Sequence, residues 1–330
     1  MSSDPIPRIA NLLQTNPPPR IVALVGAGIS TAANIPDFRT PQTGLYAKLA
    51  TLKLPYPEAI FDVNFFRHTP EPFYAIARAR KPRNLSPTLT HAFLALLAKK
   101  NLLHFVFTQN VDGLEQDAGV RDSQVLAVHG NWKRQRCLRC KRAYPDDLME
   151  RAIEMGEVPY CLEEGCKGPV KPDVVFFGQE LPRDFEELER TKLPEADIML
   201  VLGTSLKVAP SSRLPRGVRE GVPRVLINME SVGDIGARDA DVVALGACDD
   251  VVKNLCDELG WTVELDSLYN EAATAAQTRM DHDTGERPSL DELIARCAEK
   301  IGPKPVTDGH RRMLENHLAA KFAGVLPGGG

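Results

Sequence analysis

The sequence predicts an α/β protein in which helices cover both faces of a parallel β-sheet and a second, smaller domain is built from insertions. Short apolar runs recur along the 330 residues and are separated by helical stretches, which is the rhythm of a parallel sheet. The runs are continuously apolar rather than alternating, as expected of strands that are buried on both faces. At roughly 150 residues per domain, the length allows about two domains.

Six apolar runs are predicted as strands, and two insertions interrupt them. The predicted strands cover residues 20–25, 102–108, 124–128, 173–177, 197–202 and 224–227. The insertion at about 40–91 is rich in proline and aromatic residues and predicts a lid with short helices, whereas the one at about 131–171 carries four cysteines. Insertions that leave a Rossmann-type sheet and return to it can pack together as a small domain, with ligands bound at the carboxyl ends of the strands.

We therefore expect a chain organised in three parts. Residues 1–19 form an N-terminal segment, 20–266 the main domain, and 267–330 a polar tail with two candidate helices. Within the main domain, the Rossmann-type parts are about 20–39, 92–130 and 172–266, and the small domain comes from about 40–91 and 131–171.

Charge and composition narrow the class of partner and compartment. A net charge of −4 argues against direct nucleic-acid binding through a basic surface and mildly favours basic protein segments. The first twenty residues have no apolar core of a signal peptide, and no run reaches transmembrane length. Seven cysteines, four of them clustered, fit a reducing compartment. We expect a cytoplasmic and/or nuclear protein without a membrane partner.

The cysteine cluster has the spacing of a metal site. Cys137 and Cys140 form one pair and Cys161 and Cys166 another, with twenty residues between the pairs. This spacing suits one zinc ion held by four thiolates, in a module spanning 137–166. Four protein ligands leave no position for water or substrate, so the zinc would be structural. The alternative is four unrelated reduced cysteines. Of the remaining cysteines, Cys256 and Cys297 are expected to pack in helices.

A glycine-rich turn follows the first predicted strand. Gly26 and Gly28 precede a stretch that can be helical, so backbone N–H groups there can bind phosphate. The third glycine of the dinucleotide-binding pattern is replaced by Thr31, and nothing acidic occurs between Asp37 and Glu58. A dehydrogenase therefore lacks its ribose-binding acid. A tight turn that binds nothing remains an alternative.

The glycine turn is the first of five motifs that occur in a fixed order. They are Gly26-Ala27-Gly28-Ile29-Ser30 continuing to Ile35-Pro36-Asp37-Phe38-Arg39, then Thr108-Gln109-Asn110-Val111-Asp112, His129-Gly130, Val175-Phe176-Phe177-Gly178 and Gly203-Thr204-Ser205-Leu206. In this order and spacing the chain resembles the sirtuins from about 20 to 261. The run 45–61 is most similar to the eukaryotic branch that contains the cytoplasmic and mitochondrial deacetylases. The resemblance implies NAD as co-substrate and removal of acetyl groups from protein lysines.

The resemblance also implies which residues contact NAD. Ala27, Gly28 and Ser30 would line the pyrophosphate site, and Asp37, Phe38 and Arg39 would sit on the mobile cofactor loop. Gln109 and Asn110 would contact the nicotinamide ribose, and Val111 and Asp112 the carboxamide. The adenosine half would be contacted by Thr204, Ser205, Asn228, Glu230 and Cys248. Gly26, Tyr46 and Gly203 are expected as further cofactor contacts.

His129 is the expected general base, with Asn110 as a second catalytic residue. A lone histidine after a strand is more often structural, but the motif order gives this one a role. An unperturbed imidazole has a pKa near working pH, so it can accept a proton from a ribose hydroxyl. The resemblance implies that the acyl oxygen attacks C1′ of the ribose and expels nicotinamide, before water releases lysine and O-acyl-ADP-ribose. Phe38 on a closing loop would exclude water.

The resemblance implies acetyl-lysine segments, from histone tails or cytoplasmic proteins, as substrates. Such peptides would pair as a strand with Val175, Phe176, Phe177 and Gly178 on one side and Val208 on the other. Gln179 replaces the glutamate common in the family, which removes one charge that attracts basic residues. Tyr46 is followed by Ala47, Lys48 and Leu49 without the arginine typical of desuccinylases, so we expect removal of acetyl groups, with longer neutral acyl groups also accepted.

Other functions remain open at this level. Mono-ADP-ribosyl transfer to protein would use the same NAD site. A catalytically silent NAD-sensing or zinc-ribbon interaction module is disfavoured because His129, Asn110 and Asp112 occur together.

The tail predicts two helices. Ser289 and Glu292 have the spacing of a capping box, and Leu290, Leu293, Ile294 and Cys297 then form one apolar face. A second helix would begin near Thr307 or Asp308, with Met313, Leu314, Leu318 and Phe322 at helical spacing. These helices would pack on the Rossmann-type domain or carry a localisation signal. Alternatively, they occupy a groove of the same or a neighbouring subunit, giving autoinhibition or a homo-oligomer contact.

Overall fold

The computed structural model describes residues 4–33, 52, 54–80, 85–281 and 289–301. The chain divides into two compact units. Unit 1 consists of Met1–Ile35, Pro82–Trp132 and Glu180–Thr284, and unit 2 of Pro36–Lys81, Lys133–Gln179 and Gly285–Gly330. Each unit has its own sheet, and each is described by itself below.

Unit 1 is built on a six-stranded sheet in the order β3-β2-β1-β6-β7-β8, with every pair of neighbours parallel. Its strands are β1 (Ile21–Val25), β2 (Leu103–Thr108), β3 (Val125–Ala127), β6 (Ile198–Leu202), β7 (Arg224–Asn228) and β8 (Val242–Leu245). The chain proceeds from β1 outward to β3 on one side and from β6 outward to β8 on the other. This is the doubly wound order, which confirms the predicted Rossmann-type fold.

Alternate residues of β1 face two separate hydrophobic cores. Ile21, Ala23 and Val25 pack with the helices α1 (Pro5–Leu13), α5 (Leu89–Lys99) and α9 (Cys248–Leu259). Val22 and Leu24 face the other core, which includes α8 (Phe185–Lys192), η5 (Leu193–Glu195) and η6 (Ser211–Arg216). Burial on both faces explains why the strands read as continuous apolar runs.

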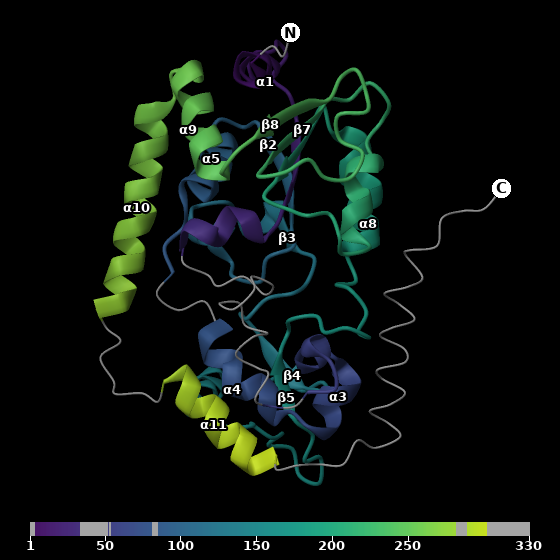
Figure 1. Cartoon of the computed structure of the whole chain (residues 1–330), viewed down its shortest axis with the longest axis vertical. Helices are drawn as coiled ribbons and strands as arrows, with labels where there is room; N and C mark the ends of the chain where they lie inside the picture. The colour runs from purple at the N-terminus through teal and green to yellow at the C-terminus, as the bar shows by residue number, and fades with distance from the viewer. Residues whose placement is uncertain (1–3, 34–51, 53, 81–84, 282–288, 302–330) are drawn as a thin grey trace, which may run out of the picture. The chain divides into compact units, whose positions relative to one another are not determined.

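The remaining elements of unit 1 are η1 (Ala27–Ala33), α6 (Leu114–Asp117), η4 (Asp122–Gln124) and α10 (Thr262–Asp281). Figure 1 shows the long helix α10 running beside α5 and α9, both of which it contacts. The sequence did not predict α10, and the expected boundary at 266/267 falls inside it. The reason is chemical: the side chains that α10 buries include the small Ala272 and Ala276, which leave only a faint apolar stripe.

Unit 2 has a two-stranded antiparallel sheet of β4 (Gln135–Cys137) and β5 (Val170–Pro172). Its helices are η3 (Pro57–Phe61), α3 (Val63–His68), α4 (Glu71–Arg80), α7 (Asp146–Met155) and α11 (Leu290–Ile301). An aromatic cluster fills its core, where the ring of Phe176 lies 5.4 Å from that of Phe66 and 5.1 Å from that of Phe73. The hydroxyl of Tyr74 donates to the carbonyl of Val170 at 2.6 Å, which ties α4 to β5.

The structure confirms five of the six predicted strands and corrects the sixth. Residues 173–177 belong to unit 2 and are no strand of the parallel sheet; Phe177 forms only an isolated bridge with Asp62. The apolar run there is explained by Phe176, which is buried among aromatic rings, and not by a sheet. The sixth strand of the sheet is β8, which was not among the predicted runs.

The first tail helix forms as predicted but in a different place. The side chain of Glu292 accepts from the backbone N–H of Ser289 at 2.5 Å, and Ser289 Oγ accepts from Glu292 N–H at 3.2 Å, so the capping box is confirmed. Leu293, Ile294 and Cys297 are buried. Helix α11 packs beside α4 in unit 2 (Figure 1), so the expectation that it packs on the Rossmann-type domain is wrong. The second tail helix lies outside the described residues.

Within the described part of the chain, no helix is both long and apolar enough to cross a membrane.

Candidate functional site

The glycine turn lies where the sheet order reverses, between β1 and β6. The N–H of Gly28 donates to the carbonyl of Gly203 at 2.7 Å, and that of Gly26 to Leu202 at 3.1 Å. A Cβ on Gly28 would lie 2.6 Å from the Cα of Gly203, and one on Gly203, whose φ is +56°, would lie 2.5 Å from the backbone nitrogen of Ile29. These glycines therefore let two loops meet at the carboxyl ends of the central strands, where such folds bind ligands.

Asn110 and Asp112, just beyond β2, are joined to the glycine turn by hydrogen bonds. The amide nitrogen of Asn110 donates to the carbonyl of Gly26 at 3.1 Å and to Ser30 Oγ at 3.2 Å. Ser30 Oγ donates to Asp112 at 2.8 Å, and Asp112 also accepts from the N–H of Leu114 at 3.1 Å. Burial raises the pKa of Asp112, and these two donors oppose that rise.

His129 follows β3 and is held through one ring nitrogen. Its Nδ1 lies 2.8 Å from the backbone carbonyl of Gln109. A carbonyl only accepts, so Nδ1 carries the proton and Nε2 has the free lone pair. Nε2 is buried without a hydrogen-bond partner among the described residues. Burial lowers the pKa of His129, partly offset by the Gln109 carbonyl, so the imidazole is neutral at physiological pH and competent to accept a proton at Nε2.

Gln109 is also held by its side chain. Thr204 Oγ1 donates to its amide oxygen at 2.8 Å, and its amide nitrogen donates to Ser211 Oγ at 2.9 Å. Ser211 was not predicted from the sequence, because it lies beyond the last motif and no local pattern singles out its hydroxyl. The structure identifies it only through its partners.

Three of the predicted adenosine-half residues, Asn228, Glu230 and Cys248, lie near the ends of β7 and β8, and the other two, Thr204 and Ser205, follow β6. The amide nitrogen of Asn228 donates to the carbonyl of Glu230 at 2.8 Å. Cys248 Sγ lies 3.5 Å from the carbonyl of Ile227, and burial raises the pKa of this thiol to about 11. The thiol of Cys248 is therefore neutral at physiological pH. Glu230 and Ser205 are exposed.

Some predicted site residues lie elsewhere or outside the described chain. Asp37, Phe38, Arg39 and Tyr46 are outside the described residues. Val175, Phe176, Phe177 and Gly178 belong to unit 2, and Val208 to unit 1. The side chain of Phe177 is 56% exposed, whereas Phe176 is buried. Gln179 accepts from the N–H of Phe176 at 3.0 Å, so its amide stabilises the turn at Gly178, whose φ is +83°.

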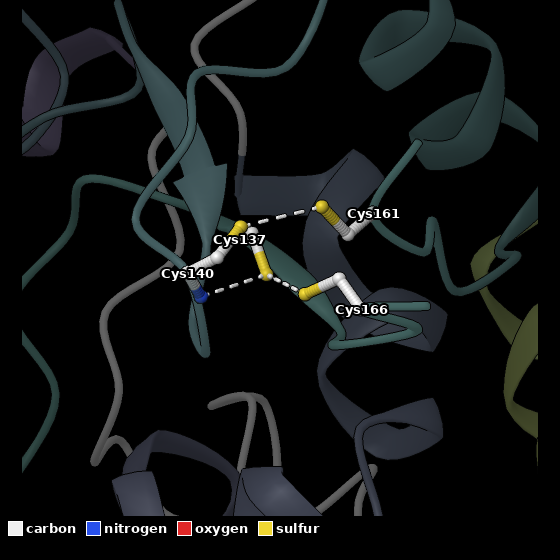
Figure 2. A group of neighbouring side chains, drawn as sticks. All are labelled: Cys137, Cys140, Cys161 and Cys166. Atoms are coloured by element: carbon white, nitrogen blue, oxygen red, sulfur yellow. Dashed lines mark hydrogen bonds between the residues drawn. The ribbon is translucent and has the colours of Figure 1, made fainter. Parts of the chain in front are cut away.

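The four clustered cysteines converge in unit 2. Cys137 and Cys140 sit at the end of β4, and their sulfur atoms face those of Cys161 and Cys166 (Figure 2). The Cys137 and Cys166 sulfurs are 3.6 Å apart, and those of Cys140 and Cys161 are 3.5 Å apart. A tetrahedron with ~2.3 Å metal–sulfur bonds has edges of ~3.8 Å, so this donor set fits a four-thiolate metal site.

Backbone conformation supports both halves of this cluster. Lys141 and Lys167 follow Cys140 and Cys166 in the left-handed region, with φ of 65° and 48°. The N–H groups of Arg139 and Cys140 point at the Cys137 sulfur, at 3.3 and 3.4 Å. Such N–H donors favour a thiolate, the form that binds metal. None of the seven cysteines forms a disulfide.

Unit 1 has the architecture of a nucleotide-binding enzyme, with a glycine turn at its switch point and a neutral buried imidazole beside it. Sequence comparison gives the family: residues 26–210 match the Sir2 family, and the chain belongs to it. The NAD-dependent protein deacetylase hst2-2 of Emericella nidulans is 51% identical over 95% of this chain and 90% of its own length. The chain is also 45% identical to the deacetylase hst2 of Schizosaccharomyces pombe, over 82% of this chain and 80% of that protein. Mouse NAD-dependent protein deacetylase sirtuin-3 is 44% identical over 78% and 77%, respectively.

Proposed function

We propose that this protein removes acetyl groups from protein lysines and consumes NAD in doing so, releasing nicotinamide and O-acetyl-ADP-ribose. The observation that carries the proposal is the state of His129: its Nδ1 proton is committed to Gln109, and Nε2 is unpartnered among the described residues. A base in this state can take a hydroxyl proton without first losing one of its own. Membership of the Sir2 family and the names of the relatives support the same activity.

In the proposed reaction, the acyl oxygen of acetyl-lysine bonds to C1′ of the ribose while the C1′–nitrogen bond breaks and nicotinamide leaves. His129 Nε2 then takes the proton of a ribose hydroxyl, and the hydroxyl oxygen bonds to the acyl carbon of the new adduct. The bond from that carbon to the lysine nitrogen breaks, lysine leaves with the proton that His129 held, and water adds to the acyl carbon to give O-acetyl-ADP-ribose. The position of His129 beyond β3, at the edge where the glycine turn also lies, supports this role.

Asn110 and Asp112 would hold the nicotinamide end of the cofactor. Asn110 is buried and tied to Gly26 and Ser30, so its orientation is fixed before any ligand binds. Asp112, held by Ser30 and Leu114, has the acceptor oxygens that a carboxamide N–H requires. The remaining predicted contacts to NAD, from Gly26, Ala27 and Gly28 to Thr204, Asn228 and Glu230, are part of this proposal.

The cysteine cluster would hold one structural zinc ion. Its sulfur spacing supports a tetrahedral site, and four thiolates leave no position open for substrate. The ion would stabilise unit 2 and take no part in the chemistry.

The substrates would be acetyl-lysine segments of histone tails or of cytoplasmic proteins, in a cytoplasmic and/or nuclear setting. The exposed Phe177 and the turn fixed by Gln179 support a peptide-pairing role for 175–178. Because Gln179 is neutral, we expect little preference for basic flanking residues. Acetyl and longer neutral acyl groups would be accepted, and succinyl groups poorly.

One experiment tests the activity against its alternatives: nicotinamide release from NAD, measured with and without an acetyl-lysine peptide. Deacetylation predicts release that depends on the acetyl group, with the product found by mass as O-acetyl-ADP-ribose. Mono-ADP-ribosyl transfer would instead place the ADP-ribose on protein, and a silent module would release no nicotinamide.

A further inference from the structure

Ser211 connects a loop to the centre of the site through a single buried hydroxyl. It begins η6 and is completely buried, with 0% exposure. Its Oγ lies 2.9 Å from the amide nitrogen of Gln109 and 3.0 Å from the carbonyl of Val208. All three residues belong to unit 1.

The direction of each hydrogen bond in this group is determined. The Val208 carbonyl can only accept, so the Ser211 hydroxyl proton points at it, and Ser211 Oγ is left to accept from Gln109. The amide oxygen of Gln109 must then face Thr204, whose hydroxyl donates to it at 2.8 Å. Thr204 Oγ1 in turn accepts from the N–H of Leu206 at 3.2 Å.

The chain of hydrogen bonds therefore starts and ends on the same loop. It runs from the N–H of Leu206 through Thr204, Gln109 and Ser211 to the carbonyl of Val208. The side-chain amide of Gln109 is the middle member of this chain, and it bonds to Thr204 through its oxygen and to Ser211 through its nitrogen. Leu206 itself has a φ of 51°, which a non-glycine residue adopts only when its surroundings hold it there.

Gln109 passes this constraint to His129 through its backbone. Its N–H donates to the carbonyl of Val25 at 2.9 Å, and its own carbonyl holds His129 Nδ1 at 2.8 Å. One residue thus joins the loop at 206–208, the end of β1 and the imidazole. With its side chain bound at both amide atoms, Gln109 has a single orientation.

We propose that Ser211 is a positioning residue for catalysis: it orients the Gln109 amide and so couples the loop at Val208, on the expected substrate side, to His129. The inference rests on the proposed deacetylase activity and adds a residue that no motif contains. Ser211 touches neither reacting group; it acts through Gln109.

Removing the Ser211 hydroxyl should reduce turnover without unfolding the protein. Ser211→Ala leaves a buried amide N–H without its acceptor and the Val208 carbonyl without one donor. Leaving a buried polar group unpaired commonly costs about tenfold or more in an equilibrium constant. We expect kcat/KM for an acetyl-lysine peptide to fall about tenfold, with a raised KM for peptide. The KM for NAD should rise as well, because Gln109 and Thr204, whose side chains belong to this chain of hydrogen bonds, are themselves expected NAD contacts.

The matched control is Ser212→Ala, one residue along the same helix. Ser212 is partly buried, and its hydroxyl has no hydrogen-bond partner within the described part of the chain, so this variant should match the wild type in kcat/KM. Melting curves of both variants, read at the assay temperature, check that each is folded.

A double-mutant cycle distinguishes positioning from a general loss of packing. In a Gln109→Leu background the Ser211 hydroxyl has no amide to orient, so adding Ser211→Ala should cost less than twofold more. Equal kinetics of Ser211→Ala and Ser212→Ala, or a full tenfold loss that persists in the Gln109→Leu background, would overturn the positioning role. Should the wild type and Ser212→Ala both fail to deacetylate the peptide, the proposed function itself is wrong, and this inference with it.

Discussion

The two units hold their functional side chains in different ways. In unit 1, His129, Asn110 and Gln109 extend from the ends of strands in a six-stranded sheet, and each is fixed by hydrogen bonds to neighbouring loops. In unit 2, four cysteines extend from short knuckles beside two strands of three residues each. The first arrangement is preorganised by the fold alone, whereas the proposed zinc ion would be needed to offset four adjacent thiolates in the second.

The largest effect should come from removing the proposed metal. Chelation, or Cys137→Ala, should unfold unit 2 and abolish activity, because the binding free energy of structural zinc is folding free energy. Hydrogen exchange would show loss of protection in α4 and α7, with the β1 and β6 amides of unit 1 still protected. Added zinc should reverse chelation, and Cys256→Ala, outside the cluster, should leave the zinc content unchanged. Loss of activity with unchanged protection in unit 2 would contradict a structural role.

In contrast to loss of the proposed metal, loss of the His129 imidazole should nearly abolish activity without unfolding either unit. His129→Ala should lower kcat about 10²–10⁴-fold, since a positioned general base typically contributes that much, while both units stay folded. His104→Ala is the matched control: this residue, also in unit 1, lies 2.9 Å from Glu195 and should be dispensable for turnover. Near-wild-type deacetylation by His129→Ala would refute the assignment.

We expect a buried lysine to make the stability of unit 2 depend on pH. Lys171 donates to the carbonyls of Pro172 and Val174 at 2.8 and 2.6 Å, and its ammonium lies 4.4 Å from the centre of the Phe176 ring. Burial lowers its pKa from 10.5 to about 7, against the attraction of Asp173. Between these two values the unfolded chain binds more protons than the folded one, so stability rises with pH.

Lys171→Met should remove this rise in the free energy of unfolding with pH, whose slope is at most about 1.4 kcal/mol per pH unit for one proton. Denaturant unfolding of unit 2 at several pH values above 7 measures it. Lys133→Met, an exposed change in the same unit, should keep the slope of the wild type. A slope that Lys171→Met leaves intact would show that another group causes it.

The smallest effect concerns the tail. Truncation after Asp266 would cut inside α10 and remove α11, so it would confound inhibition with damage to both units. Truncation after Ile301 keeps both helices. If the last segment competes with a substrate, this variant should have a lower apparent KM for peptide or NAD at unchanged melting temperature. Unchanged kinetic constants would assign the segment to packing or targeting.

How much the sequence predicts depends on whether a feature is local. Five strands were predictable because burial on both faces leaves a continuous apolar run, and the capping box of α11 because Ser289 and Glu292 lie three positions apart. The run at 173–177 misled because aromatic rings bury Phe176 as effectively as a sheet would. The link from Ser211 to Gln109 joins residues 102 positions apart, and no spacing along the chain indicates it.

In the candidate site, too, local features were predictable from the sequence and non-local ones were not. The cysteine spacing predicted a convergence that the structure shows, and the predicted glycine turn lies at the carboxyl ends of the central strands. The tautomer of His129 could not be predicted, because it depends on a carbonyl twenty positions earlier that reaches the imidazole only after β2 and β3 pair.

The pH dependence of kcat/KM tests the central claim most directly, because this quantity reports the pKa of the essential base in the free enzyme. His129 is neutral in our account, with a pKa that burial holds below its ordinary value of 6.5. Activity should therefore be lost only as the pH falls below 6.5, where Nε2 gains a proton, and should be constant through neutral pH. An acidic limb centred above pH 6.5 would contradict the assignment of His129 Nε2 as the base.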